Sequence, residues 1–357
     1  ETYTMAPIPT NGTVAVTGSA GFIGGWVVRN LLDRGYRVKA CVRHMDDASK
    51  TTFLKALPGY TSGRLTLHAA DLNNDGCFDD IFPGCHGVAH ISHINGYGDD
   101  DYVSRVCNHI IKSVNNADTV NRVIVTSSIA AVVSESNFDE MTTRPVIYED
   151  RYPDKDNPRL SGYSRSKQQA EQIFAVAAEQ HGRWDAITCC PADNVGPIQS
   201  AHHGDGGPWQ GLMKKMLQGE CNPAVHGYRP WHTVDVRDTA DCHIGLLESV
   251  DIKNGERYIA YAAERVDVDD VCARIDSLIP ELGYATPDLT ESQDAEAQAK
   301  RDSRRAVYWG TDLRNDRIRA VTGITFRDLN DSLRDMAESL ITVGEVTPVL
   351  RDGFSLP

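Results

Sequence analysis

The sequence predicts an α/β protein built on a doubly wound parallel sheet, with a smaller α/β unit formed by its C-terminal part. Short runs rich in β-branched residues alternate with longer helical patterns through the first half of the chain. This alternation is typical of parallel strands joined by helical crossovers. A glycine-rich turn directly follows the first run, and the alternation loosens beyond Pro191, which indicates where the smaller unit begins.

Strands and helices of the main sheet are expected in a regular order. The stretches with the composition of buried strands are residues 13–18, 36–43, 64–71, 87–92, 120–128 and 184–192. The intervening helical patterns lie at 22–35, 47–57, 76–82, 101–118 and 163–181. Gly35 is expected to end the first helix, because glycine commonly follows a helix C-terminus.

The C-terminal part predicts fewer regular elements. Residues 196–211 are rich in Gly, Pro and His, which favours a loop. Residues 231–249 indicate a strand that returns to the sheet, followed by a helix, and 326–341 have the amphipathic pattern of a final helix. The highly charged segment 285–305 is expected to be a solvated connection or a helix.

Charge and cysteine content argue against several classes of function. With 36 basic and 50 acidic residues the formal net charge is −14, which argues against nucleic acid or an anionic membrane as the main partner. No stretch approaches ~18 uninterrupted apolar residues, and the first residues lack the pattern of a secretion signal. The nine cysteines are scattered, odd in number and without a CxxC pair, so we expect a reducing, cytoplasmic setting.

Gly18, Gly21 and Gly24 form a GxxGxxG pattern between the first strand and the first helix. Glycine permits a tight turn, lets the main chain approach a pyrophosphate, and lets the helix lie close to the strand. The helix N-terminus presents free N–H groups to the phosphates. The pattern predicts a dinucleotide site; taken alone, it also fits a glycine-rich turn without a ligand.

Basic residues after the second strand indicate which dinucleotide is bound. Proteins that bind NAD usually place Asp or Glu there, whereas this chain has Arg43, with Lys50 seven residues later. A planar, permanently charged guanidinium suits the 2′-phosphate of NADP(H); a solvated arginine at a strand end is the alternative. After the third strand, Asp71 can accept a hydrogen bond from adenine, or it can cap a turn.

Two histidine pairs need a separate interpretation. His90 and His93 have an HxxH spacing, but no Cys or carboxylate completes a metal set, and alternate residues of a strand point apart. We therefore expect no metal. His202 and His203 are expected to belong to a polar loop.

Tyr163 and Lys167 lie four positions apart, hence on one face of a predicted helix. Ser127 and Ser128 end the preceding strand, and ligands bind beyond the carboxyl ends of parallel strands. Hydride addition to a carbonyl leaves charge on oxygen, so a proton donor must be in reach. Tyr163 can supply the proton, its pKa lowered by the ammonium of Lys167, while Ser128 orients the carbonyl.

Together these motifs resemble those of the extended short-chain dehydrogenase/reductase family, and within it the dihydroflavonol 4-reductase-like carbonyl reductases. The stretches that carry the resemblance run in family order: VTGSAGFIG, ACVRH with Lys50, HAADL, GVAHIS, VIVTSS, YSRSK, CPADNVGP and WHTVDVRDTADCHI. The resemblance implies a Rossmann domain with a C-terminal substrate domain. It also implies NADPH-dependent reduction of ketones or aldehydes, reversible toward alcohol oxidation, by a monomer or homodimer acting on a small molecule.

By motif position, the resemblance assigns Ser128, Tyr163 and Lys167 to catalysis. The implied cofactor-binding residues are Gly18, Ala20, Gly21, Phe22, Ile23, Gly24, Arg43, Lys50, Asp71, Leu72, Ile91, Ser92, Ser127, Pro191 and Val195, together with Tyr163 and Lys167. The implied cofactor domain comprises residues 11–195 and 231–262, and the substrate domain comprises 196–230 and 263–345, with flexible ends at 1–10 and 346–357.

Departures from the family pattern concern the substrate. The flavonoid reductases usually carry Asn or Asp five residues after the catalytic Ser, where this chain has Val133, and their Pro after the fourth strand is replaced by Ile94. Residues 95–104 are short and acidic. These departures favour a small to medium, mostly apolar ketone or aldehyde over a flavonoid. The side chains expected in the substrate pocket are His93, Tyr97, Val133, Phe138, Trp209 and Trp231.

Two other kinds of function fit parts of the pattern. An NAD-dependent nucleotide-sugar epimerase or dehydratase, or a hydroxysteroid-type dehydrogenase of the same superfamily, would share the fold. Arg43 argues against the NAD-dependent proteins. A non-catalytic NADP(H)-sensing protein would tend to lose the tyrosine or the lysine, and this chain has both.

Overall fold

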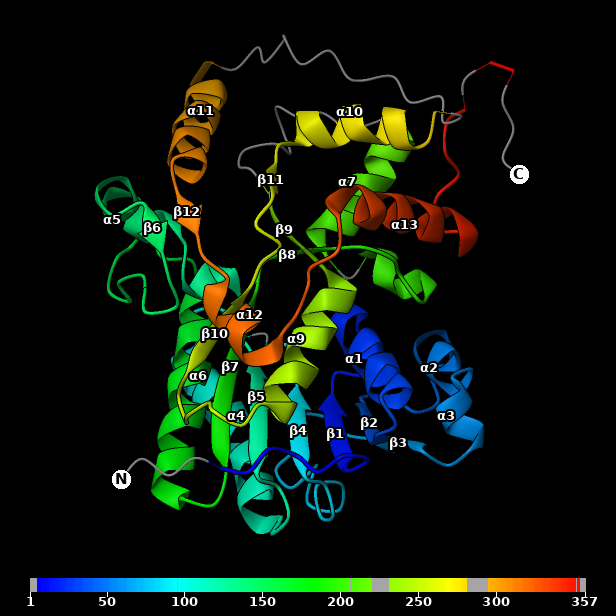
Figure 1. The fold of residues 1–357 in the computed structure, drawn as a ribbon, viewed down its shortest axis with the longest axis vertical. Helices are drawn as coiled ribbons and strands as arrows, with labels where there is room; N and C mark the ends of the chain where they lie inside the picture. Colours follow the sequence, from blue (N-terminus) through cyan, green and yellow to red (C-terminus); the bar gives the residue numbers. More distant parts are fainter. Residues whose placement is uncertain are drawn as a thin grey trace.

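A seven-stranded sheet, parallel throughout, forms the centre of the molecule. The computed structural model describes residues 5–94, 96–205, 207–219, 231–280, 295–350 and 352–353. Strands follow the order β10-β7-β5-β4-β1-β2-β3 across the sheet (Figure 1). Their bounds are β1 (Thr13–Thr17), β2 (Arg37–Val42), β3 (Leu65–Ala69), β4 (Gly87–His90), β5 (Arg122–Thr126), β7 (Asp185–Pro191) and β10 (Arg257–Ala260). This order confirms the predicted doubly wound α/β fold.

The six predicted strands all occur in this sheet, and one edge strand was not predicted. That strand, β10, has the short sequence RYIA, which begins with buried Arg257 and contains only three apolar residues. The prediction that the strand at 231–235 returns to this sheet is wrong. It forms β9 (Trp231–Asp235), which pairs with β8 (Asp193–Val195) and β11 (Arg265–Val266) in a separate sheet, because pairing partners are chosen by tertiary contacts rather than by composition.

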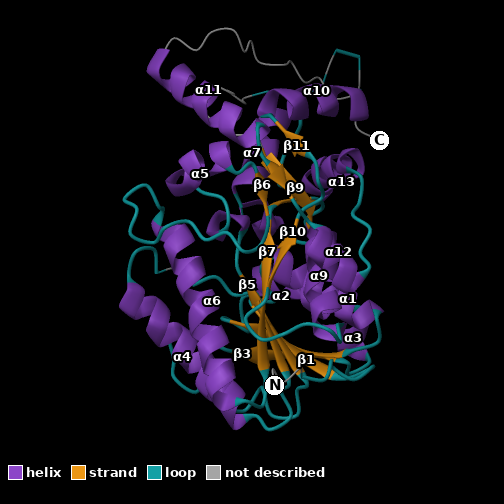
Figure 2. Cartoon of the chain, turned by 60° about the vertical axis from the view of Figure 1, so that its left-hand side comes forward, coloured by secondary structure: helices purple, strands orange, loops and turns teal. Residues whose placement is uncertain are grey.

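Helices cover both faces of the main sheet. On one face α1 (Phe22–Asp33) contacts α9 (Val236–Glu248), and on the other α4 (Asp100–Asn116) contacts α6 (Gly162–His181). Figure 2 shows the two pairs on opposite sides of the strands. All four helices were predicted from their periodic patterns.

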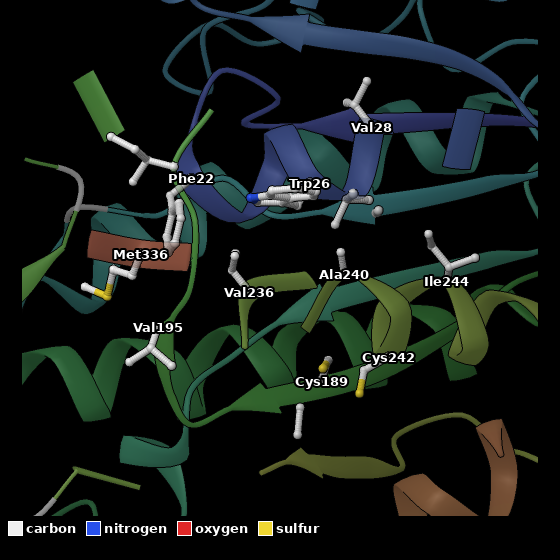
Figure 3. Packing of buried hydrophobic residues seen from close by; sticks show 14 of the residues in the cluster. Phe22, Trp26, Val28, Cys189, Val195, Val236, Ala240, Cys242, Ile244 and Met336 are labelled. Atoms are coloured by element: carbon white, nitrogen blue, oxygen red, sulfur yellow. The ribbon is translucent and has the colours of Figure 1, made fainter. Parts of the chain in front are cut away.

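Helix α1 illustrates how the sequence selects the buried face. Val27, Val28 and Leu31 recur at helical spacing and are buried, and burial of each such side chain stabilises the fold by about 1.5–3 kcal/mol. Trp26 of α1 faces Ala240 of α9 in the core of this face (Figure 3). This packing holds the glycine-rich N-terminus of α1 next to the end of β1.

The remaining elements lie mainly at one end of the sheet (Figure 1). They include α7 (Pro208–Leu217), α10 (Val268–Leu278), α11 (Ala295–Trp309), α12 (Asp316–Thr322), α13 (Leu329–Thr342), and the short pair β6 (Val146–Ile147) and β12 (Asp312–Leu313). Shorter helices are α2 (Ala48–Lys55), α3 (Pro58–Thr61), α5 (Phe138–Thr143), η1 (Ile129–Ala131), η2 (Glu135–Asn137) and η3 (Ala201–Asp205). Within the described ranges, no helix has the length and apolar character needed to cross a membrane.

Several predicted segments need correction. The helix expected at 76–82 is a series of turns, in which the N–H of Phe82 bonds the carbonyl of Phe78 at 3.0 Å. The stacked rings of these two residues are buried, so their apolar spacing serves the core rather than a full helix. The expected loop at 196–211 contains η3 and the start of α7. Of the charged segment 285–305, residues 295–305 lie in α11, and 285–294 lie outside the described residues.

Candidate active site

A cavity of about 780 Å³ opens where the central strands end. Ligands of doubly wound sheets bind at this edge. Predicted residues that line the cavity are Gly18, Ala20, Gly21, Phe22, Ile23, Gly24, Arg43, Lys50, Leu72, Ile91, Ser92, His93, Tyr97, Ser127, Ser128, Tyr163, Lys167, Pro191 and Trp209. Most of the predicted cofactor positions and the three predicted catalytic residues therefore share one cavity.

The glycine-rich turn after β1 forms a cradle that larger residues would fill. Gly18 has a φ of +68°, and a Cβ at this position would lie 2.9 Å from the backbone nitrogen of Ser92. A Cβ at Gly24 would collide with the carbonyl oxygen of Gly18. No side chain of the described residues caps the N-terminus of α1, which begins after Gly21. The cradle and the free helix terminus suit the pyrophosphate of a dinucleotide.

Two basic side chains from the segment after β2 also line the cavity. Arg43 and Lys50 line the cavity and are exposed, and the Nζ atom of Lys50 lies 3.9 Å from the Asp47 carboxylate. Asp71 does not line the cavity. Its carboxylate accepts hydrogen bonds from the backbone and the side-chain amide of Asn73, at 3.0 and 2.9 Å. Asp71 thus caps a turn, which was the alternative to the adenine contact.

The ends of β5 and α6 bring the three predicted catalytic side chains together. Tyr163 lies in the first turn of α6, which Ser161 caps by accepting a hydrogen bond from Ser164. Ser128, which lies just after β5, lines the cavity beside Tyr163, and its side chain acts to lower the pKa of Tyr163. The Nζ atom of Lys167 lies 5.7 Å from the centre of the Tyr163 ring. A phenol, a hydroxyl and an ammonium from two elements thus share one wall of the cavity.

Burial dominates the acid–base properties of these groups. It raises the pKa of Tyr163, and the neighbouring Ser128 side chain only partly opposes this rise. The expectation that Lys167 lowers the pKa of Tyr163 is therefore not met. Burial also lowers the pKa of Lys167 to about 8, although the carboxylate of Glu171 acts in the opposite direction.

Three aromatic rings surround the reacting end of the cavity. The rings of His93 and Tyr97 lie 5.5 and 5.7 Å from that of Tyr163, and His93 Nε2 lies 2.6 Å from the Tyr97 hydroxyl. Burial and the charge of Lys167 lower the pKa of His93 to about 4. With this lowered pKa, His93 is neutral at physiological pH.

Gly162 determines how closely the Tyr97 backbone approaches α6. A Cβ at Gly162 would lie 3.1 Å from the carbonyl carbon of Tyr97, so glycine at this position permits the close approach.

The profile of the NAD dependent epimerase/dehydratase family matches residues 14–260, which include the main sheet apart from Thr13 at the start of β1, and the three catalytic candidates. The chain belongs to this family. The match agrees with the resemblance to extended short-chain dehydrogenases/reductases that the motifs carry.

Relatives of this epimerase/dehydratase family member include named reductases. Dihydroflavonol 4-reductase of Zea mays is 37% identical over 202 residues, which cover 53% of this chain and 55% of that protein. In that match the chain spans little more than half of the relative's length. Cinnamoyl-CoA reductase 1 of Arabidopsis thaliana is 30% identical over 350 residues, which cover 95% and 92%. The crystal structure of vestitone reductase from alfalfa (Medicago sativa) matches with a TM-score of 0.74 at 27% identity, covering 94% of this chain and 100% of that one.

Some predicted site residues of this family member lie away from the cavity. Val195 is fully buried in the core with α1 and α13, because β8 turns it away from Asn194, which lines the cavity. Val133 packs in another core cluster, and Phe138 contacts Tyr308 there. The predictions that these three residues face a ligand are not supported. The side chain of Trp231 lies outside the described part of the chain.

The structure also brings residues to the site that were not predicted. Asp193 and Gln210 line the cavity and are buried, and Asp193 accepts a hydrogen bond of 2.9 Å from the backbone of His232. His202 and His203, expected in a polar loop, place their Nε2 atoms 2.6 and 3.0 Å from the carbonyl oxygen of Ala20. For these residues the sequence offered one signal, namely that Asp193 directly follows a predicted strand. The contact of His202 and His203 with the glycine-rich turn has no such signal, because it forms only when the chain folds.

Proposed function

We propose that this family member is an NADPH-dependent reductase that reduces the carbonyl of a ketone or aldehyde. One observation carries the proposal: the Tyr163 phenol and the Ser128 hydroxyl line the same cavity as the glycine-rich turn after β1. A dinucleotide held at that turn would extend toward Tyr163, which sets a substrate carbonyl and a proton donor at reacting distance. The named reductases among the relatives support this reading.

NADP(H) suits the residues that line the cavity. Gly18 and Gly24 leave room for the pyrophosphate, and Arg43 and Lys50 offer positive charge to a 2′-phosphate. Lys167 would hold the ribose hydroxyls of the nicotinamide half. Bound there, the reduced nicotinamide would supply a hydride to the carbonyl carbon.

The chain's own residues would handle the proton. Burial raises the pKa of Tyr163, so the phenol is protonated at neutral pH and can donate to the carbonyl oxygen. The Ser128 hydroxyl would bond the same oxygen and orient it. Lys167 has a pKa lowered to about 8, so it exchanges its proton more readily near neutrality than an exposed lysine.

The substrate would enter beside Tyr163. His93, Tyr97 and Trp209 offer aromatic surface on this side of the cavity, while Asp193 and Gln210 offer polar groups. A small to medium, mostly apolar carbonyl compound, or the corresponding alcohol in the reverse direction, suits such a mixed wall.

The test is a panel of aliphatic and aromatic ketones and aldehydes, each with NADPH and with NADH. We expect carbonyl-dependent loss of the reduced-nicotinamide absorbance with one alcohol formed per NADPH consumed. Tight binding of NADPH without turnover on any compound would favour the sensing protein instead. NAD retained through purification, with conversion of a nucleotide sugar, would favour the epimerase or dehydratase.

A further inference from the structure

We infer that Glu171 is a positioning residue of the proposed reductase site, because it locks the end of β5 against α6 and so fixes Ser128 relative to Tyr163. The inference rests on the proposed function, since it adds a residue to the same site. Glu171 does not line the cavity, which Tyr163 and Lys167 do.

Three consecutive residues at the end of β5 each contact a residue of α6, and those α6 residues recur every four positions. The pairs are Thr126 with Lys167, Ser127 with Glu171, and Ser128 with Tyr163. Positions four apart share one helical face. The catalytic pair and the lysine pair therefore belong to one row of contacts, and the Ser127–Glu171 pair is its third member.

The middle pair is buried. Ser127 and Glu171 are each 4% exposed, and the Ser127 hydroxyl donates its hydrogen bond to Oε1 of Glu171. The backbone N–H of Ser127 also donates to the carbonyl of Cys189 at 2.8 Å. Both the main chain and the side chain of Ser127 are thus held, so Ser128, the next residue, has little freedom to move away from Tyr163.

An ion pair between Glu171 and Arg257 extends these contacts to the residues that follow Ser128. The Nε atom of Arg257, in β10, lies 2.9 Å from Oε2 of Glu171, and Nη2 of the same guanidinium donates to the carbonyl of Ala131 at 3.0 Å. Ala131 ends the short helix η1 that follows Ser128. Glu171 and Arg257 together therefore bracket the backbone that carries Ser128.

A contribution to stability does not by itself explain the buried ion pair between Glu171 and Arg257. Desolvating two charges offsets much of their attraction, and apolar residues of similar size stabilise a core as well or better. Positioning has a steeper consequence, because a displacement of about 1 Å at a reacting group costs roughly 100-fold in rate. The contacts of Glu171, directly with Ser127 and through Arg257 with Ala131, match such a role.

Kinetics of three variants test the inference. Ser127→Ala removes the hydroxyl and leaves the Glu171–Arg257 pair intact; we expect kcat to fall at least tenfold while KM for NADPH changes less than twofold. Glu171→Leu should lower kcat as far, and Glu171→Gln should recover part of it, because its amide oxygen can still accept from Ser127. A loss confined to KM for NADPH would overturn the inference.

A matched control is available in α4. Ser113 also donates from a buried hydroxyl to a carboxylate, that of Asp79, at 2.6 Å, but neither residue lines the cavity. Ser113→Ala should keep kcat within twofold of the wild type. An equal loss in Ser113→Ala and Ser127→Ala would overturn the inference, because it would reduce the effect to general loosening.

Hydrogen exchange of the cofactor-free protein supplies a readout besides activity. The backbone amides of residues 126–131 should exchange at least fivefold faster in Ser127→Ala than in the wild type. In Ser113→Ala, the exchange rates of the same amides should equal those of the wild type. Unchanged exchange of these amides in Ser127→Ala, or a kcat of Ser127→Ala within twofold of the wild type, would refute the positioning role of Glu171. If the wild type reduces no carbonyl compound, the proposed function fails instead, and the proposed effect of Glu171 on turnover fails with it.

Discussion

Lys167 donates a hydrogen bond of 2.9 Å from Nζ to the carbonyl oxygen of Thr126, which fixes its ammonium at the end of β5. The side chain is 9% exposed, and the aromatic ring of Tyr163 lies beside it. Burial favours the neutral amine and lowers the pKa of Lys167 to about 8. The charge of this lysine therefore changes near neutral pH, unlike that of an exposed lysine.

Stability should report this shift. In the unfolded chain the pKa of Lys167 returns to 10.5, so between about pH 8 and 10.5 the unfolded state binds the extra proton and stability rises with pH. Below pH 8 both states are protonated and the cost of the buried charge is fully present. The free energy of unfolding of the wild type, minus that of Lys167→Met, should rise by about 2–3 kcal/mol across this interval. Urea titrations at several pH values would measure it, and a flat or falling difference would contradict the burial effect.

Tyr163→Phe removes only the phenolic hydroxyl. We expect kcat with a carbonyl substrate to fall by about 100- to 10,000-fold, the usual contribution of a positioned acid, while the dissociation constant of NADPH changes less than about threefold. Tyr102→Phe is the matched control, since that hydroxyl bonds Asn73 at 3.0 Å outside the cavity. Turnover of Tyr163→Phe near the wild-type level would show that another group donates the proton.

Arg43→Ala should change the choice of cofactor. Loss of a charge-assisted contact to a 2′-phosphate should raise KM for NADPH by about 10-fold or more, with KM for NADH within twofold of the wild type. Arg37→Ala is the control, because Arg37 lies at the other end of β2 and is exposed. An equal rise in KM for NADPH and for NADH in Arg43→Ala would show that the arginine does not contact the 2′-phosphate.

Gly24→Ala tests the cradle directly. The added methyl group would meet the carbonyl oxygen of Gly18, so α1 must shift, at a cost of about 1–3 kcal/mol in stability. NADPH affinity should fall with it. Gly211→Ala, in α7, meets no atom of the described residues within 4 Å and should be neutral or stabilise by up to about 1 kcal/mol. Thermal unfolding and NADPH titration of both variants measure these effects. Wild-type NADPH affinity in Gly24→Ala would show that a glycine at this position is not required for cofactor binding.

Much of the fold could be predicted because its signals are local. The periodic burial of Val27, Val28 and Leu31 in α1 and the six apolar strand runs are each visible within a few residues, and the structure confirms them. Strand β10 escaped prediction because it is only four residues long and begins with the charged Arg257. The charge of that arginine is balanced by Glu171, a partner far away in the chain.

The candidate site was predicted in part for the same reason. Gly18 and Gly24 form their pattern within one turn, and Tyr163 and Lys167 within one turn of helix, so residue spacing was sufficient to find them. Val195, Val133 and Phe138 were misplaced because each belongs to a segment whose orientation depends on core packing. The contact of His203 with Ala20 had no sequence signal at all.

The sequence by itself determined the parallel α/β architecture, the glycine cradle and the catalytic spacing, because strand composition, helical period and turn chemistry act between near neighbours. Only the tertiary structure decided that Ser127 bonds Glu171, that Arg257 pairs with Glu171, and that burial raises the pKa of Tyr163. Contacts and desolvation of this kind arise when distant segments close around a shared cavity, and no local pattern encodes them.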